Sequence, residues 1–350
     1  MSANAIYLSG LGRLPRAYME FANGKDRREG TIWPFAVLLY HRVDACRDPY
    51  SSAIPAHVFD AQMSYLANNF NVMSLSQLLD RVEQGIGVEP RTLAITFDDG
   101  YRDNYTYAHP ILEKYNLPAT LFVATGYTDT FRRMWNDRIA DAIQHTDRGF
   151  VTVTLPAETL TLRLDSERSK HGTMLLVLEK LKSLPESAKQ RVVDDIVQQA
   201  GCTKTPGDRL MLNWAELREM AASIWEIGSH TVEHRILTKT SPAAAERELR
   251  TSKEALEEHL QIPITLLAYP NGKEDDFSQS VKGLAQSAGY RAALTTVSEL
   301  NGEGFEPFEI RRISPWEEQL PLFAVKLEWM FWNCTREVRR NLRSWREEKL

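Results

Sequence analysis

The chain has 350 residues, of which 43% are hydrophobic and 25% charged, the composition of an ordinary soluble protein with a full core. Its net charge of -5 gives no support for a nucleic-acid partner, and no run approaches the ~18 apolar residues of a membrane span. Cys46, Cys202 and Cys334 are too few and too scattered for a disulfide framework or a cysteine metal site.

Residues 1–34 precede the first clear strand pattern and are interpreted as an N-terminal extension. The segment is mildly apolar but has no basic leader followed by a clean apolar run, so we do not predict a signal peptide. The expected location is therefore cytoplasmic.

Short apolar runs alternate with helical patterns from residue 35 to residue 319. This alternation predicts an α/β fold with a parallel sheet, and seven or eight such units favour a distorted (β/α) barrel over an open sheet. The predicted strands cover residues 35–43, 71–75, 93–97, 119–124, 224–228, 264–269, 291–296 and 309–313.

An insertion interrupts this alternation from about residue 131 to residue 211. Within it, the stretch FVTVTLPAETLTLRL alternates with period two on both sides of Pro156, which predicts a β-hairpin. Two helical patterns follow at 174–183 and 186–200, separated by a break that supplies a cap. We expect a subdomain over one end of the barrel.

The C-terminal segment, residues 320–350, is basic and aromatic. Five of its residues fall at helical spacing on one face: Phe331, Cys334, Val338, Leu342 and Trp345. Such an amphipathic helix could lie on an anionic membrane surface as a peripheral contact. A terminal helix docked on the barrel or on a partner subunit explains the pattern as well.

Two adjacent carboxylates end the strand in LAITFDDGYRDN. Asp98 and Asp99 stand at a strand end, and barrel active sites lie where the strands end. Successive strand side chains point to opposite sides, so one carboxylate could bind a metal while the other serves as a base. Asp and Gly are also common in turns, so this motif alone does not decide between a site and a cap.

Two histidines follow another strand in EIGSHTVEHRIL. On a first helical turn, His230 and His234 would share one face, which suits two ligands of a single ion. Two histidines and one carboxylate, with positions left open for water, form a common hydrolytic metal site.

Two further strand ends carry candidate groups. His41 closes the strand in VLLYHRV and is a candidate general acid, although a lone histidine is more often structural. The strand in LLAYPNGKEDD runs into a tight turn at Asn271, where backbone N–H groups could stabilise an oxyanion, or simply form a turn.

Taken together, TFDDG, SHTVEH and AYPNG resemble, in order and spacing, the polysaccharide deacetylases of carbohydrate esterase family 4, the NodB-homology domain. The resemblance implies that Asp98 is the catalytic base and that Asp99, His230 and His234 bind one divalent ion, usually zinc. The implied reaction is hydrolysis of the N-acetyl group of an amino sugar in a polysaccharide or in its lipid-linked precursor. An N-acetylated glycan is thus the expected partner.

The sequence departs from the family pattern at two places. The third motif usually reads Arg-x-Pro-aromatic, but here it is Ala268-Tyr269-Pro270-Asn271, so the arginine that orients the base is expected to be missing. The late Leu-x-x-His motif is absent too. Both departures, with the leading YHRV, are similar to the bacterial poly-N-acetylglucosamine deacetylase branch, a resemblance that assigns the acid role to His41.

Other residues are candidates for a sugar-binding rim, because aromatic faces suit sugar rings and the insertion lies nearby. They are Tyr101, Trp135, Asp137 and Trp214. A deformylase, or a deacetylase of a small or lipid-linked sugar, would use the same catalytic residues. From another class, an inactive carbohydrate-binding relic would be expected to have lost one of the four metal-site and base residues, yet all four are present.

Overall fold

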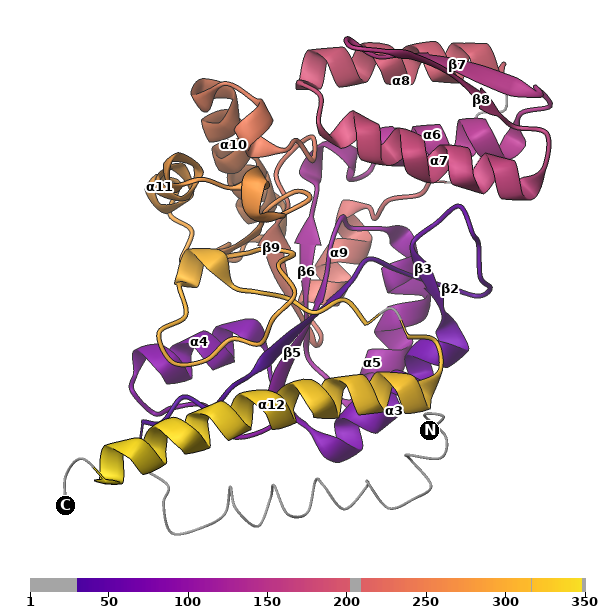
Figure 1. Ribbon diagram of the computed structural model, residues 1–350. Coiled ribbons are helices and arrows are strands. Elements are labelled where there is room, and N and C mark those ends of the chain that lie inside the picture. Colours follow the sequence, from indigo (N-terminus) through magenta and orange to yellow (C-terminus); the bar gives the residue numbers. More distant parts are fainter. Residues whose placement is uncertain (1–29, 202–208, 316, 348–350) are drawn as a thin grey trace.

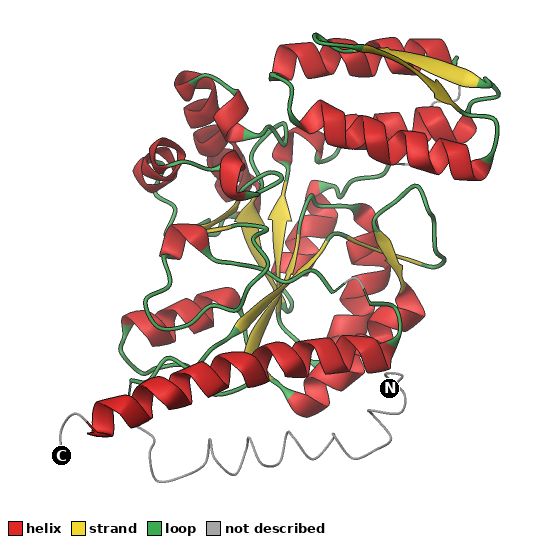
Figure 2. Cartoon of the chain, viewed as in Figure 1, coloured by secondary structure: helices red, strands yellow, loops and turns green. Residues whose placement is uncertain are grey.

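A curled sheet of seven parallel strands forms the centre of the computed structural model, which describes residues 30–201, 209–315 and 317–347 (Figures 1 and 2). Its strands run in the order β1-β5-β6-β9-β10-β11, with the short β4 paired to β5. Their bounds are β1 Ala36–Tyr40, β4 Asn71–Val72, β5 Thr92–Phe97, β6 Ala119–Val123, β9 Trp225–Ser229, β10 Leu266–Ala268 and β11 Ala292–Leu294.

The segment 310–313 joins the two edges of this sheet. Ile310 forms a parallel bridge with Leu294 of β11, and Ile313 forms one with Leu38 of β1. The Ile310 N–H donates to Ala293 O at 3.0 Å, and the Ile313 N–H donates to Val37 O at 2.8 Å. The predicted distorted barrel of parallel strands is thereby confirmed.

Helices cover the outside of the barrel, and for this reason all residues of β1, β5, β6, β10 and β11 are buried. Local sequence fixes where several helices begin. Ser74 and Asn213 each close a capping box, and Ser241 caps a helix whose first residue is Pro242. The helices are α3 Ala56–Asn69, α4 Leu75–Glu83, α5 His109–Tyr115, α9 Trp214–Ala221, α10 Pro242–Leu260 and α11 Gln279–Ser287.

Shorter elements complete the barrel loops. A π-helical turn, η2 (Asn104–Ala108), precedes α5, and β2 (Arg42–Asp44) pairs in parallel with β3 (Ala53–Pro55). Among the described residues, four 3-10 turns lie in the connections: η3 Thr125–Tyr127, η4 Leu237–Lys239, η5 Glu274–Asp276 and η6 Pro307–Glu309.

A lobe with its own hydrophobic core stands beside one end of the barrel (Figure 1). It contains α6 Trp135–His145, β7 Phe150–Thr154, β8 Thr159–Arg163, α7 Glu167–Lys182 and α8 Glu186–Ala200. The predicted hairpin is present, since β7 and β8 are antiparallel with Val151 opposite Leu162. The first predicted helix is longer than expected, because Ser166 forms a capping box eight residues before Met174.

The C-terminal helix α12 (Leu320–Glu347) crosses the barrel beside α3 (Figure 1). Phe331 is buried and its ring lies 5.5 Å from that of Phe70, while Glu328 accepts hydrogen bonds from Arg91 at 2.6 Å and from Tyr65 at 2.8 Å. The side chains of Val338, Leu342 and Trp345, which belong to the predicted amphipathic face, lie outside the described part of the helix. Among the helices that the structure describes, none is long and apolar enough to cross a membrane.

Candidate active site

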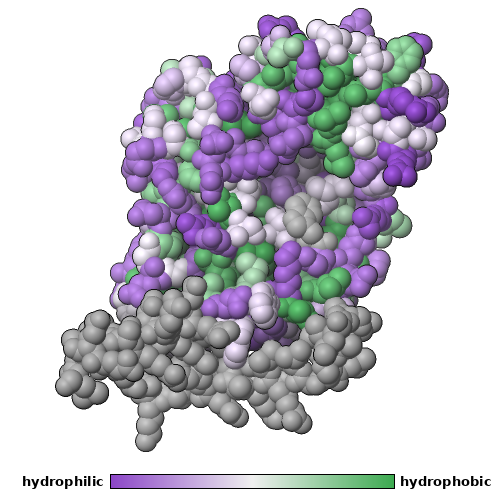
Figure 3. Space-filling view, in the orientation of Figure 1, coloured by the Kyte–Doolittle hydropathy of each residue, from purple (hydrophilic) through white to green (hydrophobic). Residues whose placement is uncertain are grey.

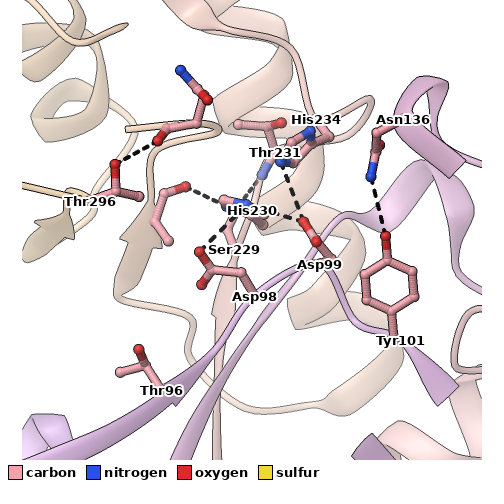
Figure 4. A network of polar contacts seen from close by, with 12 residues as sticks. Thr96, Asp98, Asp99, Tyr101, Asn136, Ser229, His230, Thr231, His234 and Thr296 are labelled. Atoms are coloured by element: carbon pink, nitrogen blue, oxygen red, sulfur yellow. Dashed lines mark hydrogen bonds and ion pairs between the residues drawn. The ribbon is translucent and has the colours of Figure 1, made fainter. Parts of the chain in front are cut away.

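The ends of four barrel strands bring the predicted residues to one mouth. His41 follows β1, Asp98 and Asp99 follow β5, His230 follows β9, and Asn271 lies three residues beyond β10. Figure 4 shows Asp98, Asp99, His230 and His234 gathered around one point. Residues that are far apart in the sequence meet here because parallel strands end on the same face.

Asp99, His230 and His234 form a compact set of metal-ligand atoms. The Asp99 Oδ1 atom lies 3.5 Å from Nε2 of His230 and 3.3 Å from Nε2 of His234, and one ligand atom from each residue lies within 4.8 Å of the others. Asp99 Oδ1 is buried and has no hydrogen-bond partner among the described residues. A divalent cation would satisfy that oxygen, so the three residues fit a metal site.

A hydrogen bond to the backbone of β10 fixes the orientation of the His230 ring. Its Nδ1–H donates to the backbone carbonyl of Ala268 at 2.7 Å. This contact assigns the proton to Nδ1, so Nε2 has a free lone pair. Nε2 is the atom that faces Asp99. The ring is therefore presented as a neutral ligand.

His234 does not follow a helical turn from His230, contrary to the prediction. Thr231 and His234 have positive φ angles of 66° and 51°, so the segment is an irregular loop. The loop is shaped by Glu248 of α10, whose Oε2 accepts from the N–H groups of Val232 and Glu233 at 2.9 and 2.8 Å. This buried carboxylate satisfies two backbone N–H groups of the irregular loop.

The Asp98-Asp99-Gly100 turn is also strained. Asp99 and Gly100 have φ angles of 79° and 86°, and a Cβ at Gly100 would lie 3.2 Å from Val123 Cγ1. A non-glycine residue held at positive φ costs roughly 1–3 kcal/mol and is often found at functional sites. The turn positions Asp98 and Asp99 side by side at the end of β5, and Ala124 N–H holds it by donating to Asp99 O at 3.2 Å.

Arg312 orients Asp98, and the prediction that this arginine is missing is wrong. Its Nη1 and Nη2 donate to the two carboxylate oxygens of Asp98 at 2.7 and 2.8 Å, and its Nε donates to Thr295 O at 2.7 Å. Arg312 is fully buried and comes from the segment that closes the barrel. The arginine absent from the Ala268 position is thus supplied about 44 residues later in the chain, a distance at which sequence spacing carries no signal.

The pKa values of the two carboxyl groups are shifted in opposite directions. Burial favours the neutral form of Asp98, but the charge and the hydrogen bonds of Arg312 outweigh it, and the pKa of Asp98 is lowered to about 2. Burial, followed by the charge of Asp98, raises the pKa of Asp99 well above its usual value. A cation at the Asp99 site would reverse that penalty, whereas Asp98 is ionised without one.

The histidines are neutral at neutral pH. Burial lowers the pKa of His230, and burial together with His230 lowers the pKa of His234. Burial also lowers the pKa of His41 to about 4, against an opposing effect of Asp98. Neutral imidazoles are the form in which histidine binds metals.

A cleft of about 570 Å³ opens between the barrel mouth and the lobe, and its lining includes His41, Tyr101 and Asp137. Of the predicted rim residues, Tyr101 is buried and its hydroxyl donates to Asp137 Oδ1 at 3.0 Å. Trp135 is buried in the lobe core, 4.9 Å from Lys189 Nζ. Trp214 stacks on His259 of α10, with ring centroids 3.9 Å apart, and is not among the residues lining this cleft.

Tyr101 also joins the Asp98-Asp99-Gly100 turn to both ends of the lobe. Its backbone forms an antiparallel bridge with Met211, where the chain returns from the lobe, and Leu212 N–H donates to Gly100 O at 3.0 Å. Its side chain reaches Asp137 of α6, where the chain enters the lobe. The guanidinium of Arg42 lies 4.6 Å from the centre of the Tyr101 ring.

The turn at Asn271 is held by its neighbours. Its φ is 61°, its carbonyl accepts from Thr296 Oγ1 at 2.7 Å, and its side-chain amide donates to Asp276. The side chain is therefore committed to the turn, which leaves the backbone N–H as the group available for the predicted oxyanion role.

The chain belongs to the polysaccharide deacetylase family, since residues 86–293 match the family model described as Polysaccharide deacetylase. The resemblance recognised in the motifs is thereby confirmed. Among curated proteins, one relative is named polysaccharide deacetylase YxkH and comes from Bacillus subtilis (strain 168). It is 22% identical over 261 residues, which cover 74% of this chain and 63% of that protein. The Escherichia coli (strain K12) poly-beta-1,6-N-acetyl-D-glucosamine N-deacetylase is 27% identical over 103 residues, covering 28% of this chain and 15% of that protein.

Solved structures share the fold. The Streptococcus pyogenes deacetylase PplD in complex with acetate superposes with a TM-score of 0.58 at 18% identity, covering 85% of this chain and 99% of that one. IcaB from Ammonifex degensii gives a TM-score of 0.56 at 18% identity, with 86% and 98% covered. This chain spans less than two thirds of the length of these curated relatives: 63% of YxkH and 15% of the E. coli protein.

Proposed function

We propose that this protein is a metal-dependent N-deacetylase of amino-sugar glycans, which hydrolyses the acetamide to acetate and a free amine. The observation that carries the proposal is the pairing of two unlike carboxylates at one barrel mouth. Asp99 lies with two neutral histidines in a metal-ligand set, and Asp98 is ionised and clamped by Arg312. Family membership and the poly-beta-1,6-N-acetyl-D-glucosamine N-deacetylase relative support the same reaction and make poly-N-acetylglucosamine the first polymer to test.

Asp99, His230 and His234 would hold the ion, and two imidazoles with one carboxylate suit zinc. When bound there, it supplies Lewis acidity and lowers the pKa of a water molecule. The ionised Asp98 takes a proton from that water as oxygen attacks the acetyl carbon. Arg312 keeps both Asp98 oxygens in place by its paired hydrogen bonds, so no reorientation is needed during attack.

His41 is proposed to give the leaving nitrogen its proton as the carbon–nitrogen bond breaks. Its pKa of about 4 in this structure means that the ring is neutral before substrate binds. Negative charge that develops on the acetyl oxygen during attack raises that pKa, so the ring takes up a proton from solvent and then donates it to the leaving nitrogen, while Asp98 later returns the water proton to solvent. The Asn271 N–H is proposed to donate to the same oxygen.

Acetate release from N-acetylated glycans tests the proposal. The panel contains poly-N-acetylglucosamine and soluble N-acetylglucosamine oligomers, each assayed with the protein as purified, after chelation and after zinc is restored. We expect release that is abolished by the chelator and recovered with zinc, and an Asp98→Asn variant that retains metal but loses about 10²–10⁴-fold in turnover. Activity that survives chelation, or an Asp98→Asn variant above about a tenth of wild-type turnover, would contradict the mechanism.

A further inference from the structure

The two histidines of the metal-ligand set are held in different ways. The ring of His230 is held by the hydrogen bond from its Nδ1 to the Ala268 carbonyl. The Nδ1 atom of His234 is buried and has no hydrogen-bond partner among the described residues. Metal-binding histidines usually gain their orientation from a hydrogen bond at the second ring nitrogen. Since no described residue makes that bond to His234, the position of its ring depends on the backbone that carries it.

The backbone before His234 is held from two sides. On the side of η3, the Gly126 N–H donates to Val232 O at 2.9 Å, and a Cβ at Gly126 would lie 2.8 Å from that oxygen. On the side of α10, Glu248 Oε2 accepts from the N–H groups of Val232 and Glu233 at 2.9 and 2.8 Å. The only side chain in these contacts is that of Glu248, so a substitution there changes the support of the loop without altering the loop itself.

Glu248 belongs to a polar strip on the inner face of α10. Ser252 lies one turn further along the helix, and the two residues are 6% and 0% exposed. Ser252 Oγ lies 2.6 Å from Ser229 Oγ, which accepts from the Thr231 N–H at 3.2 Å. The N–H groups of three successive loop residues are therefore satisfied by α10, two of them directly and one through Ser229.

Glu248 lies outside the path of the substrate. The cleft that His41 and Tyr101 line is the hollow between lobe and barrel in Figure 3, and no described residue of α10 contributes to its lining. The second carboxylate oxygen, Glu248 Oε1, lies 3.4 Å from Nε of Arg235, the residue that directly follows His234. Glu248 thus contacts the chain on both sides of His234.

We propose that Glu248 is a positioning residue for the metal site and sets its metal affinity through the backbone that carries His234. The inference rests on the proposed metal-dependent function, because it takes Asp99, His230 and His234 as the ligands. Loss of an outer contact to a metal-binding histidine typically lowers metal affinity by about 10–100-fold. Here the loop N–H groups receive that contact in place of the imidazole ring.

Zinc affinity, measured without turnover by competition with a chromophoric chelator, tests this role. Glu248→Leu removes the acceptor and should weaken zinc binding by about 10–100-fold. Glu248→Gln keeps an oxygen that can accept from both N–H groups and should remain within about threefold of the wild type. Glu246 is 45% exposed and pairs with Arg250 on the same helix, so the matched control Glu246→Leu should leave the affinity unchanged.

A double variant separates an effect through His234 from a general loss of stability. In a His234→Ala background, Glu248→Leu should change zinc affinity by less than about twofold, because the ligand that Glu248 positions is gone. Urea unfolding of each metal-free protein verifies that it is folded. If Glu248→Leu does not fold, Glu248→Asp replaces it: its carboxylate is one methylene shorter, and we expect about a 3–10-fold loss of affinity.

Wild-type zinc affinity in the folded Glu248→Leu or Glu248→Asp protein would overturn the inference. An equal loss with and without the His234 side chain, or an equal loss in Glu246→Leu, would overturn it as well. A wild-type protein that binds no zinc would overturn the proposed function together with this inference. Zinc-dependent acetate release by the wild type, combined with unaltered zinc affinity in the Glu248 variants, would reject only the role of Glu248.

Discussion

Replacing Arg312 by methionine leaves Asp98 as a buried carboxylate without its partner. The exposed fractions of the two side chains are 0% and 3%, so water cannot take over the lost hydrogen bonds. A pKa of about 2 against the usual 3.8 corresponds to about 2.5 kcal/mol of stabilisation of the ionised form. This contribution is present above about pH 4 and is lost as the pH falls towards 2, because the unfolded chain then binds the proton first.

Removal of one partner from a buried ion pair typically costs about 3–5 kcal/mol. We therefore expect Arg312→Met to lower the free energy of unfolding at pH 7 by about that amount, a large part of a total of about 5–15 kcal/mol. The double variant Asp98→Asn with Arg312→Met removes both charges and should be more stable than Arg312→Met alone, because replacement of a whole buried pair is often nearly neutral. Urea unfolding of the wild type, both single variants and the double variant measures the coupling.

Additive effects of the two substitutions would refute the argument that the pair acts as a unit. Turnover adds a second measurement. Arg312→Lys keeps the charge but cannot reproduce a bidentate contact, so it should lose turnover while it retains metal. Wild-type turnover in Arg312→Lys would show that the orientation of Asp98 does not depend on the guanidinium.

Three further predictions concern the metal, the acid and the lobe. The purified protein should bind about one equivalent of divalent metal, and metal analysis of His230→Ala should show a sharp fall; unchanged content would exclude His230 as a ligand. His41→Ala should cut amide turnover by roughly 10²–10⁴-fold but affect an ester with a good leaving group much less, and equal losses would point to substrate positioning instead. Burial raises the pKa of Asp137 to about 6, so the folded state loses up to about 3 kcal/mol as the pH rises from about 4 to 6. Asp137→Asn removes this loss, and its stability relative to wild type should therefore increase between pH 4.5 and pH 7 in urea titrations; a constant difference would contradict the shift.

The sequence predicted the positions of those candidate site residues that directly follow a strand. Asp98, Asp99 and His230 could be predicted because apolar strands stop at them, and parallel strands place their ends together. Local patterns also predicted the hairpin and the helix at Glu186–Ala200. These features depend on periodicity and capping, which act over a few residues.

Features that depend on tertiary contacts could not be predicted in this way. Arg312 lies in a predicted strand, but only barrel closure turns it towards Asp98. The positions of Tyr101 and Trp214 were anticipated only as aromatic residues near the insertion, and no local pattern shows which neighbour a ring packs against. The loop at His234 is held by Glu248 of α10, which accepts from the N–H groups of Val232 and Glu233, a tertiary contact that no local pattern shows.

The attachment of Tyr101 to both ends of the lobe makes the lobe and the Asp98-Asp99-Gly100 turn one mechanical unit. A rotation of the lobe that widens the cleft must either break the Tyr101–Asp137 hydrogen bond or pull on the residue that follows Gly100. Admission of a bulky substrate therefore opposes retention of the Asp98 and Asp99 geometry. The joint at Tyr101 thus couples the width of the cleft to the backbone of the turn that carries Asp98 and Asp99.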